Sequence, residues 1–108
     1  MTPGADSHLD AMFHAFSHRV RREIISMVSS HPLSIGELVP RFDMSFEAVS
    51  KHVRVVEQAG IVQREVRGRN HVCHLNTDAM KEAMDWLNGY QGFWQSRLDT
   101  LQALLQKP

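Results

Sequence analysis

Apolar residues recur at helical spacing through the first third of the chain. Steps of three and four residues predict a first helix over about residues 8–17, and its apolar stripe consists of Leu9, Met12, Phe13 and Phe16. The same spacing in Val20, Ile24 and Val28 predicts a second helix. The sequence SSHP ends that helix, because the residue before a proline is disfavoured in helical geometry.

Two capping signals then mark a pair of closely spaced helices. Ser34 and Glu37 have the capping-box pattern, which starts a third helix expected to bury Ile35, Leu38, Val39 and Phe42. After the short connection FDMS, Ser45 is placed to cap a fourth helix, and Gly60 is a suitable residue to end it. The buried face of this fourth helix is expected to hold Phe46, Val49, Val53 and Val56.

The periodicity changes after Gly60. Alternation of β-branched and polar residues in IVQREVRGRNHVCHL predicts a β-hairpin that turns at Gly68. Helical spacing returns after Asn76, and its apolar stripe consists of Met80, Met84, Leu87, Trp94, Leu98, Leu101 and Leu105. Gly89 and Gly92 weaken the middle of this stretch and leave open whether it forms one helix or two.

This order of elements predicts a mainly α fold with a small β-hairpin, in a single domain over residues 1–108. The third and fourth helices form a helix-turn-helix over about residues 34–60, and the hairpin over about residues 61–75 makes it a winged helix-turn-helix. A C-terminal helical segment follows over about residues 77–106. In such a motif the second helix is held by its buried face and places its other face in the major groove of DNA.

The overall composition adds few constraints. The 108 residues are 43% hydrophobic and 22% charged, without an apolar run long enough to span a membrane or a signal-peptide pattern. The single cysteine excludes an internal disulfide and fits a reducing interior, so we expect a cytoplasmic location. The formal net charge is zero, but residues 41–71 contain six basic and four acidic side chains, so the middle of the chain is mildly positive.

The exposed face of the fourth helix has side chains that suit a DNA groove. Lys51 can donate to guanine O6 or N7, Ala48 can touch a thymine methyl, and Arg54 lies farther along, where a phosphate is in reach. Glu47 fits only where it accepts a hydrogen bond from cytosine. The alternative is a merely solvated helix face. The candidate DNA-contacting residues of this helix are Ser45, Glu47, Ala48, Ser50, Lys51, His52 and Arg54.

The predicted hairpin has a basic tip. Arg67 and Arg69 flank Gly68, with Asn70 beside them and Arg64 on the strand. A basic tip next to a recognition helix can follow the DNA backbone or enter the minor groove. The alternative is an edge hairpin that its charges keep soluble. The succession of helix, cap and basic hairpin favours DNA binding.

Three stretches resemble the ArsR-type (ArsR/SmtB, arsenical-resistance repressor) family of winged-helix regulators: AFSHRVRREII, LSIGELVPRFDMSFEAVSKHVRVVEQAGIV and REVRGRNHVCHLN. The run AVSKHVRVVEQAGIV is the most specific, and FWQSRLDTLQALL resembles a C-terminal helix found in a subset of these regulators. The resemblance implies a regulator of transcription that contacts DNA through the helix and hairpin residues named above. One departure is Arg19, where the family usually has a proline.

The resemblance also bears on metal sensing. Many members bind a metal through a cysteine pair on the third helix or through Asp and His ligands on the last helix, but here the third helix lacks cysteine and the stretch after Asn76 lacks histidine. We therefore expect no metal at those sites and no cofactor. His71 and Cys73 share one strand face while His74 lies on the other, which falls short of three converging ligands. A metal or redox role for Cys73 stays open beside the simpler role of a small core residue.

The apolar C-terminal stripe is wider than so small a core needs, so we expect part of it to face a second copy of the chain. A two-fold homodimer would place two recognition helices about one turn of DNA apart, roughly 34 Å, to read an inverted repeat. The residues expected at this interface are Leu9, Met12, Phe13, Phe16, Met84, Leu87, Tyr90, Trp94, Leu98 and Leu101.

The sequence thus predicts a sequence-specific DNA-binding transcriptional regulator. We expect a homodimeric repressor that occupies an inverted-repeat operator through the helix at residues 45–59 and the hairpin at residues 61–75, with a small-molecule or protein effector left open. The alternative is a protein-interaction module that uses the winged helix or the aromatic C-terminal helix. An enzyme is not expected, because the sequence shows no nucleophile–base pair, glycine-rich phosphate loop or paired carboxylates at a recognisable spacing.

Overall fold

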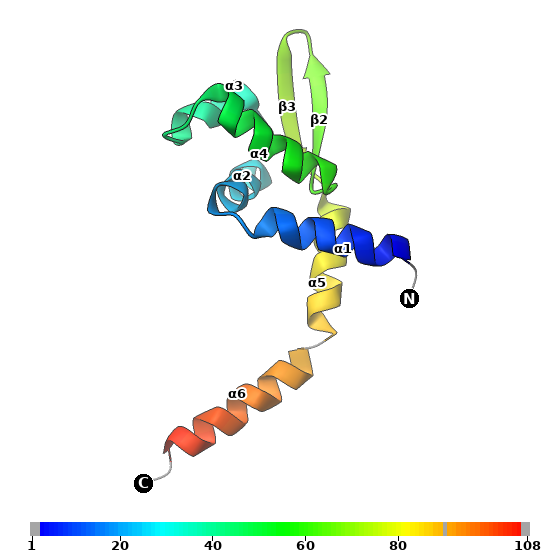
Figure 1. Ribbon diagram of the computed structural model, residues 1–108, viewed down its shortest axis with the longest axis vertical. Helices are drawn as coiled ribbons and strands as arrows, with labels where there is room; N and C mark the ends of the chain where they lie inside the picture. Colours follow the sequence, from blue (N-terminus) through cyan, green and yellow to red (C-terminus); the bar gives the residue numbers. More distant parts are fainter. Residues whose placement is uncertain (1–2, 90, 107–108) are drawn as a thin grey trace.

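The computed structural model describes the backbone of residues 3–89 and 91–106. In chain order the elements are α1 (Pro3–Phe16), α2 (Arg19–Ser30), β1 (Leu33–Ser34), α3 (Ile35–Leu38), the 3-10 turn η1 (Val39–Arg41), α4 (Phe46–Gln58), β2 (Val62–Arg67), β3 (Asn70–Leu75), α5 (Thr77–Asn88) and α6 (Gln91–Gln106) (Figure 1). The predicted fold class, mainly α with a winged helix-turn-helix, is confirmed. None of the described helices combines the length and the apolarity that crossing a membrane requires.

The predicted caps set the bounds of the helix-turn-helix. Ser34 Oγ accepts a hydrogen bond from the Glu37 backbone N–H at 3.1 Å, and the Glu37 carboxylate accepts one from the Ser34 N–H at 3.1 Å, so the capping box is confirmed. Ser45 Oγ accepts from the Ala48 N–H at 3.1 Å at the start of α4. Gly60, just past the end of α4, has a φ of 80°, a conformation that L side chains rarely adopt.

The sheet is antiparallel, with the strand order β1-β3-β2. The hairpin pairs Arg67 with Asn70 across a two-residue loop, and Gly68 in that loop has a φ of 62°, which glycine adopts without strain. The predicted turn at Gly68 is therefore confirmed. The short strand β1 pairs Leu33 with Cys73 and Ser34 with Val72. It joins the hairpin to the start of α3, and it was not predicted because two residues show no alternation.

The core lies between α1, α2, α4 and the sheet. Val49, Val53 and Val56 of α4 are fully buried, as predicted. Phe46 is not: its side chain is 54% exposed, and its predicted burial is wrong. The reason is its place at the first turn of α4, where Met44, from the connection before the helix, packs against the core. Val39 and Phe42, expected to be buried with α3, are only partly buried.

The C-terminal segment forms two helices. Helix α5 ends at Asn88 and α6 begins at Gln91, so a break occurs at Gly89, one of the two glycines that the sequence marked as weak, whereas Gly92 lies within α6. Helix α5 meets α1 through His8, whose Nδ1 lies 3.2 Å from Glu82 Oε2, and Ala79 and Ala83 of α5 are buried. Helix α6 extends away from the body of the molecule (Figure 1). With α6 included, the molecule measures 63 × 37 × 21 Å. The described side chains of α6 are exposed.

Candidate nucleic-acid interface

One face of α4 is held by the core, which leaves the opposite face available to a ligand. Lys51, Arg54 and Glu47 are exposed on that face, whereas Ala48 and Ser50 are half-buried. The anchoring valines are fully buried, so the orientation of α4 is fixed relative to α2 and the sheet. The exposed side chains are thereby displayed on a rigid element.

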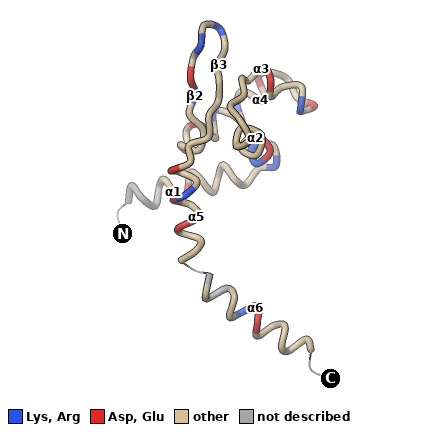
Figure 2. The backbone as a smooth tube through the Cα atoms, turned by 180° about the vertical axis from the view of Figure 1, so that it is seen from behind, with Lys and Arg blue, Asp and Glu red and all other residues tan. Residues whose placement is uncertain are grey.

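A groove of about 670 Å³ lies between α4 and the hairpin, called here the wing (residues 62–75). From β1 and the start of α3 it is lined by Ser34, Ile35 and Gly36, and from α4 by Phe46, Glu47, Ser50, Lys51 and Arg54. From the wing it is lined by Arg64, Arg69, Asn70 and His71. The groove contains four cationic side chains and one acidic one, so it favours an anionic ligand. Figure 2 shows basic residues at the tip of the wing.

The groove brings together most of the sequence-predicted DNA contacts, but not all of them. Glu47, Ser50, Lys51, Arg54, Arg64, Arg69 and Asn70 line it. Ser45, Ala48, His52 and Arg67 do not. Ser45 instead caps α4, and Ala48 donates its N–H to that cap. The structure therefore divides the predicted set into groove-lining residues and residues with other contacts.

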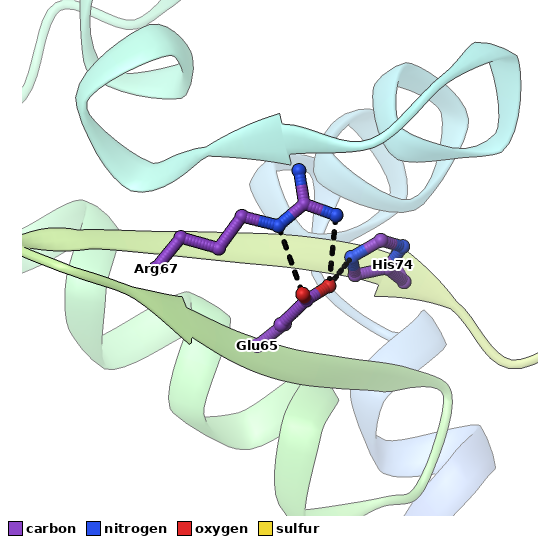
Figure 3. A network of polar contacts seen from close by, with 3 residues as sticks. All are labelled: Glu65, Arg67 and His74. Atoms are coloured by element: carbon purple, nitrogen blue, oxygen red, sulfur yellow. Dashed lines mark hydrogen bonds and ion pairs between the residues drawn. The ribbon is translucent and has the colours of Figure 1, made fainter.

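Arg67 is held on the outer face of the wing. Its Nε lies 2.8 Å from Glu65 Oε1 and its second terminal nitrogen lies 3.0 Å from Glu65 Oε2, a two-pronged pair shown in Figure 3. His74 Nε2 lies 2.8 Å from the same Oε2. The hydrogen bond from Arg67, followed by that of His74, holds the pKa of Glu65 below its ordinary value, and Glu65 raises the pKa of Arg67. The charge of Arg67 is thus largely matched within the wing.

Arg69 and Arg64 differ from Arg67 in how far their charge is paired with other side chains of the protein. Arg69 sits in the turn, where it has no hydrogen bond or salt bridge to any other described residue. Half-buried Arg64 has its Nε 3.2 Å from Glu57 Oε2, within ion-pair distance but without hydrogen-bond geometry, and it donates to His71 Nδ1 at 3.2 Å. Of the wing arginines, Arg69 has the charge most available to a ligand.

His52 faces the corner between α1 and α2 rather than the groove. Its Nδ1 lies 3.3 Å from an Arg21 terminal nitrogen, and because arginine only donates, this contact requires an unprotonated Nδ1. The ring also lies 4.3 Å, centroid to centroid, from that of His18, the cap of α2. Burial, then His18 and Arg21, lowers the pKa of His52. This contact joins residues 31 positions apart, so no local pattern could have predicted it.

The predicted dimer residues differ in how much of their surface a partner could reach. The expectation for Met12 is corrected, because its side chain is fully buried inside the protomer and offers no surface to a partner. Leu9, Phe13 and Phe16 are partly buried, whereas the α5 and α6 residues Met84, Leu87, Leu98 and Leu101 are exposed. Tyr90 and the side chain of Trp94 lie outside the described part of the structure.

Trp86 is an aromatic residue that the sequence analysis missed. Its ring meets that of Phe13 edge-on, with centroids 5.5 Å apart, and Phe13 in turn lies 6.0 Å from Phe16. Residues 79, 83 and 86 follow helical spacing and so share one side of α5, one position away from the predicted methionine stripe. Small alanines hid this face from a search for large apolar residues.

The remaining metal-ligating side chains do not converge. Among the described residues there is no group of three or more His, Cys, Asp or Glu side chains that could hold a metal ion. Cys73 is fully buried, and burial raises the pKa of its thiol. Cys73 is therefore a small core residue, the simpler of the two roles considered for it. His71 and His74 are turned to different partners, Arg64 and Glu65.

Comparisons with known proteins place this arrangement among regulators of transcription. Residues 18–64 match the family described as "Bacterial regulatory protein, arsR family". The uncharacterized HTH-type transcriptional regulator YuzN of Bacillus subtilis (strain 168) is 30% identical over 82 residues, which cover 69% of this chain and 89% of YuzN. The transcriptional repressor SdpR of the same organism is 23% identical over 79 residues, which cover 73% of this chain and 88% of SdpR.

Solved structures agree with the family match. A crystal structure of an ArsR family transcriptional regulator has a TM-score of 0.77 at 26% identity, and the match covers 84% of this chain and 94% of that one. A homodimeric winged helix-turn-helix DNA-binding domain from Mycobacterium bovis, solved in solution, has a TM-score of 0.65 at 12% identity, covering 77% of this chain and 79% of that one. The second likeness is one of fold alone.

Proposed function

Because the chain belongs to the arsR family of bacterial regulatory proteins and is a DNA-binding regulator of transcription, we propose that it acts as a homodimeric repressor that occupies an inverted-repeat operator. Helix α4 and the wing are the elements proposed to contact DNA. One observation carries this proposal: a cationic groove between a firmly anchored helix and the wing, lined by seven of the residues expected to bind DNA. Chromosomal DNA in a bacterium lies in the cytoplasm, so we also propose that location.

The groove suggests how the two elements share the duplex. With α4 in the major groove, the DNA backbone next to it runs between α4 and the wing, where Arg54 and Arg69 meet phosphates. Lys51 lies on the α4 side and is proposed to donate to guanine O6 or N7. Arg67, paired with Glu65, contributes less than Arg69. His52 holds α4 in place and is not proposed as a base contact.

The homodimer is proposed from the apolar surface on the other side of the molecule. Met84, Leu87, Leu98 and Leu101 expose large apolar side chains along α5 and α6. An apolar surface of this extent is unfavourable in a monomer and typical of an interface. The domain of similar fold from Mycobacterium bovis is a homodimer, and the repressor SdpR is a relative, which support the dimer and the repressor function respectively.

The test is a selection of duplexes from a random library, followed by fluorescence anisotropy on the selected duplex and on a scrambled one at several salt concentrations. We expect preference for the selected duplex and an affinity that falls steeply with salt, because bound phosphates release counterions. Arg69→Ala and Arg54→Ala should weaken binding to both duplexes and each lower the salt slope by about 1. Lys51→Ala should instead reduce the preference between the two duplexes.

Lys81→Ala provides the control, because it removes the same charge from an exposed residue of α5 that does not line the groove. It should leave affinity and salt slope close to those of the wild-type protein. Failure to enrich any sequence, or an affinity that ignores salt, would contradict DNA recognition by this groove. In that outcome the exposed surface of α5 and α6 becomes the place to look for a protein partner.

A further inference from the structure

Phe46 exposes an aromatic ring at a position where α4 was expected to bury it. Its side chain is 54% exposed, although Val49 and Val53, which continue the same apolar stripe, are fully buried. Met44, just before the Ser45 cap, packs against the core at this end of the helix. Phe46 is not among the side chains that form this core or pack against it, so core packing does not explain it.

The ring of Phe46 is part of the wall of the groove. It lines the groove with Ile35 and Gly36 beside it and the charged side chains of Glu47 and Lys51 from the same helix. A phenyl ring neither donates nor accepts an ordinary hydrogen bond, so an apolar group of the ligand is the favoured partner for it in this groove. The rest of the groove suits an anion, so the ring selects for an anionic ligand that also presents an apolar group at this place.

The major groove of DNA offers one apolar group at the base edges, the C5 methyl of thymine. Residues at the N-terminus of a recognition helix are the ones that reach base edges, and Phe46 is the first residue of α4. We propose that Phe46 contacts a thymine methyl and makes α4 selective for thymine at one position of each half-site. This rests on the proposed placement of α4 in the major groove, and 5-methylcytosine would satisfy the same contact.

The experiment removes the methyl group and the ring separately. Each thymine of the duplex selected by the wild-type protein is replaced by deoxyuridine, which lacks only the methyl, and affinities are measured for the wild type and Phe46→Ala. For one thymine per half-site we expect the replacement to weaken wild-type binding about three- to fourfold, as for a methyl-sized group returned to water. In Phe46→Ala the same replacement should have no effect.

Two further measurements make the result specific. At that position, 5-methylcytosine in place of cytosine should strengthen binding by the wild type but not by Phe46→Ala. Val66→Ala is the matched control, because Val66 is 60% exposed on β2 but does not line the groove, and it should keep the dependence on the thymine methyl. Circular dichroism checks that each variant keeps the helical content of the wild type.

The failures of the two proposals are distinguishable. If the wild type selects and binds its duplex but is indifferent to every thymine methyl, or is equally sensitive with and without the ring, the role of Phe46 is refuted and DNA recognition stands. A wild type that selects no sequence refutes both.

Discussion

Arg21 is a buried charge at the corner where α1, α2 and α4 meet, and its removal should be costly. Arg21 is 7% exposed. Its Nε donates to the Ala15 carbonyl at 3.0 Å, and one terminal nitrogen donates to the His14 carbonyl at 2.9 Å. The other terminal nitrogen meets His52 Nδ1 on α4. Arg21→Ala deletes all of these contacts together with the stem that fills the corner.

The magnitude follows from the contacts. A hydrogen bond to a charged group contributes about 1.5–3 kcal/mol, so the two carbonyl bonds alone suggest about 3–6 kcal/mol. Both carbonyls belong to the last turn of α1, where water replaces part of the loss. We expect Arg21→Ala to lower the free energy of unfolding by about 3 kcal/mol. For a chain of 108 residues this shifts Tm by about 10 °C or more.

The assay is urea unfolding followed by circular dichroism at one fixed protein concentration, because association would make stability depend on concentration. Arg22→Ala is the matched control, since Arg22 is the next residue of α2 and donates to the Phe16 carbonyl at 2.7 Å, but is exposed. It should cost less than about 1 kcal/mol. Equal destabilisation by the two variants would refute the argument that burial makes Arg21 structurally important.

Three further outcomes are expected. Folding lowers the pKa of His52 from its ordinary value of 6.5, so the unfolded chain binds the proton more readily than the folded one. The stabilisation should therefore be fully present above about pH 6.5, and the free energy of unfolding should fall as the pH drops below it. Urea titration should show a shallower fall in His52→Asn. Glu65→Gln should raise DNA affinity and steepen its salt dependence in anisotropy, because it frees Arg67 and removes a negative charge from the wing. Ser45→Ala should cost about 1 kcal/mol in thermal unfolding through loss of the α4 cap, whereas Ser26→Ala, on an exposed position of α2, should cost less.

Local chemistry explains what the sequence could predict. The cap at Ser45 involves the Ala48 N–H three residues away, and the turn at Gly68 depends on the conformational freedom of one residue. Such features are decided within a few positions, and the structure has them where they were expected. The break near Gly89 belongs to the same class, because glycine weakens a helix wherever packing does not hold it.

Contacts between distant segments, and the choice of side-chain rotamers, explain what the sequence could not predict. The spacing of Phe46 predicts burial together with the valines of α4, but only the packing of the surrounding elements decides that its side chain is 54% exposed. Met12 has the same apolar character as its partly buried neighbours Leu9, Phe13 and Phe16, and only the position of α1 against the body decides that Met12 is fully buried. The charge of Arg67 is matched by a glutamate that the sequence shows two residues away, yet pairing depends on rotamers that spacing alone does not specify.

The contact between Arg21 and His52 also connects the two proposed surfaces. Arg21 binds the C-terminal turn of α1, a helix proposed to lie near the dimer interface, and His52 belongs to α4, which is proposed to enter the major groove. In a homodimer the distance between the two recognition helices depends on how rigidly each α4 is joined to its α1. We therefore expect a loosened joint to relax the spacing between half-sites that the dimer accepts, before it affects which bases α4 reads. In this way the buried arginine is expected to influence operator geometry, although it lies outside the groove proposed to receive DNA.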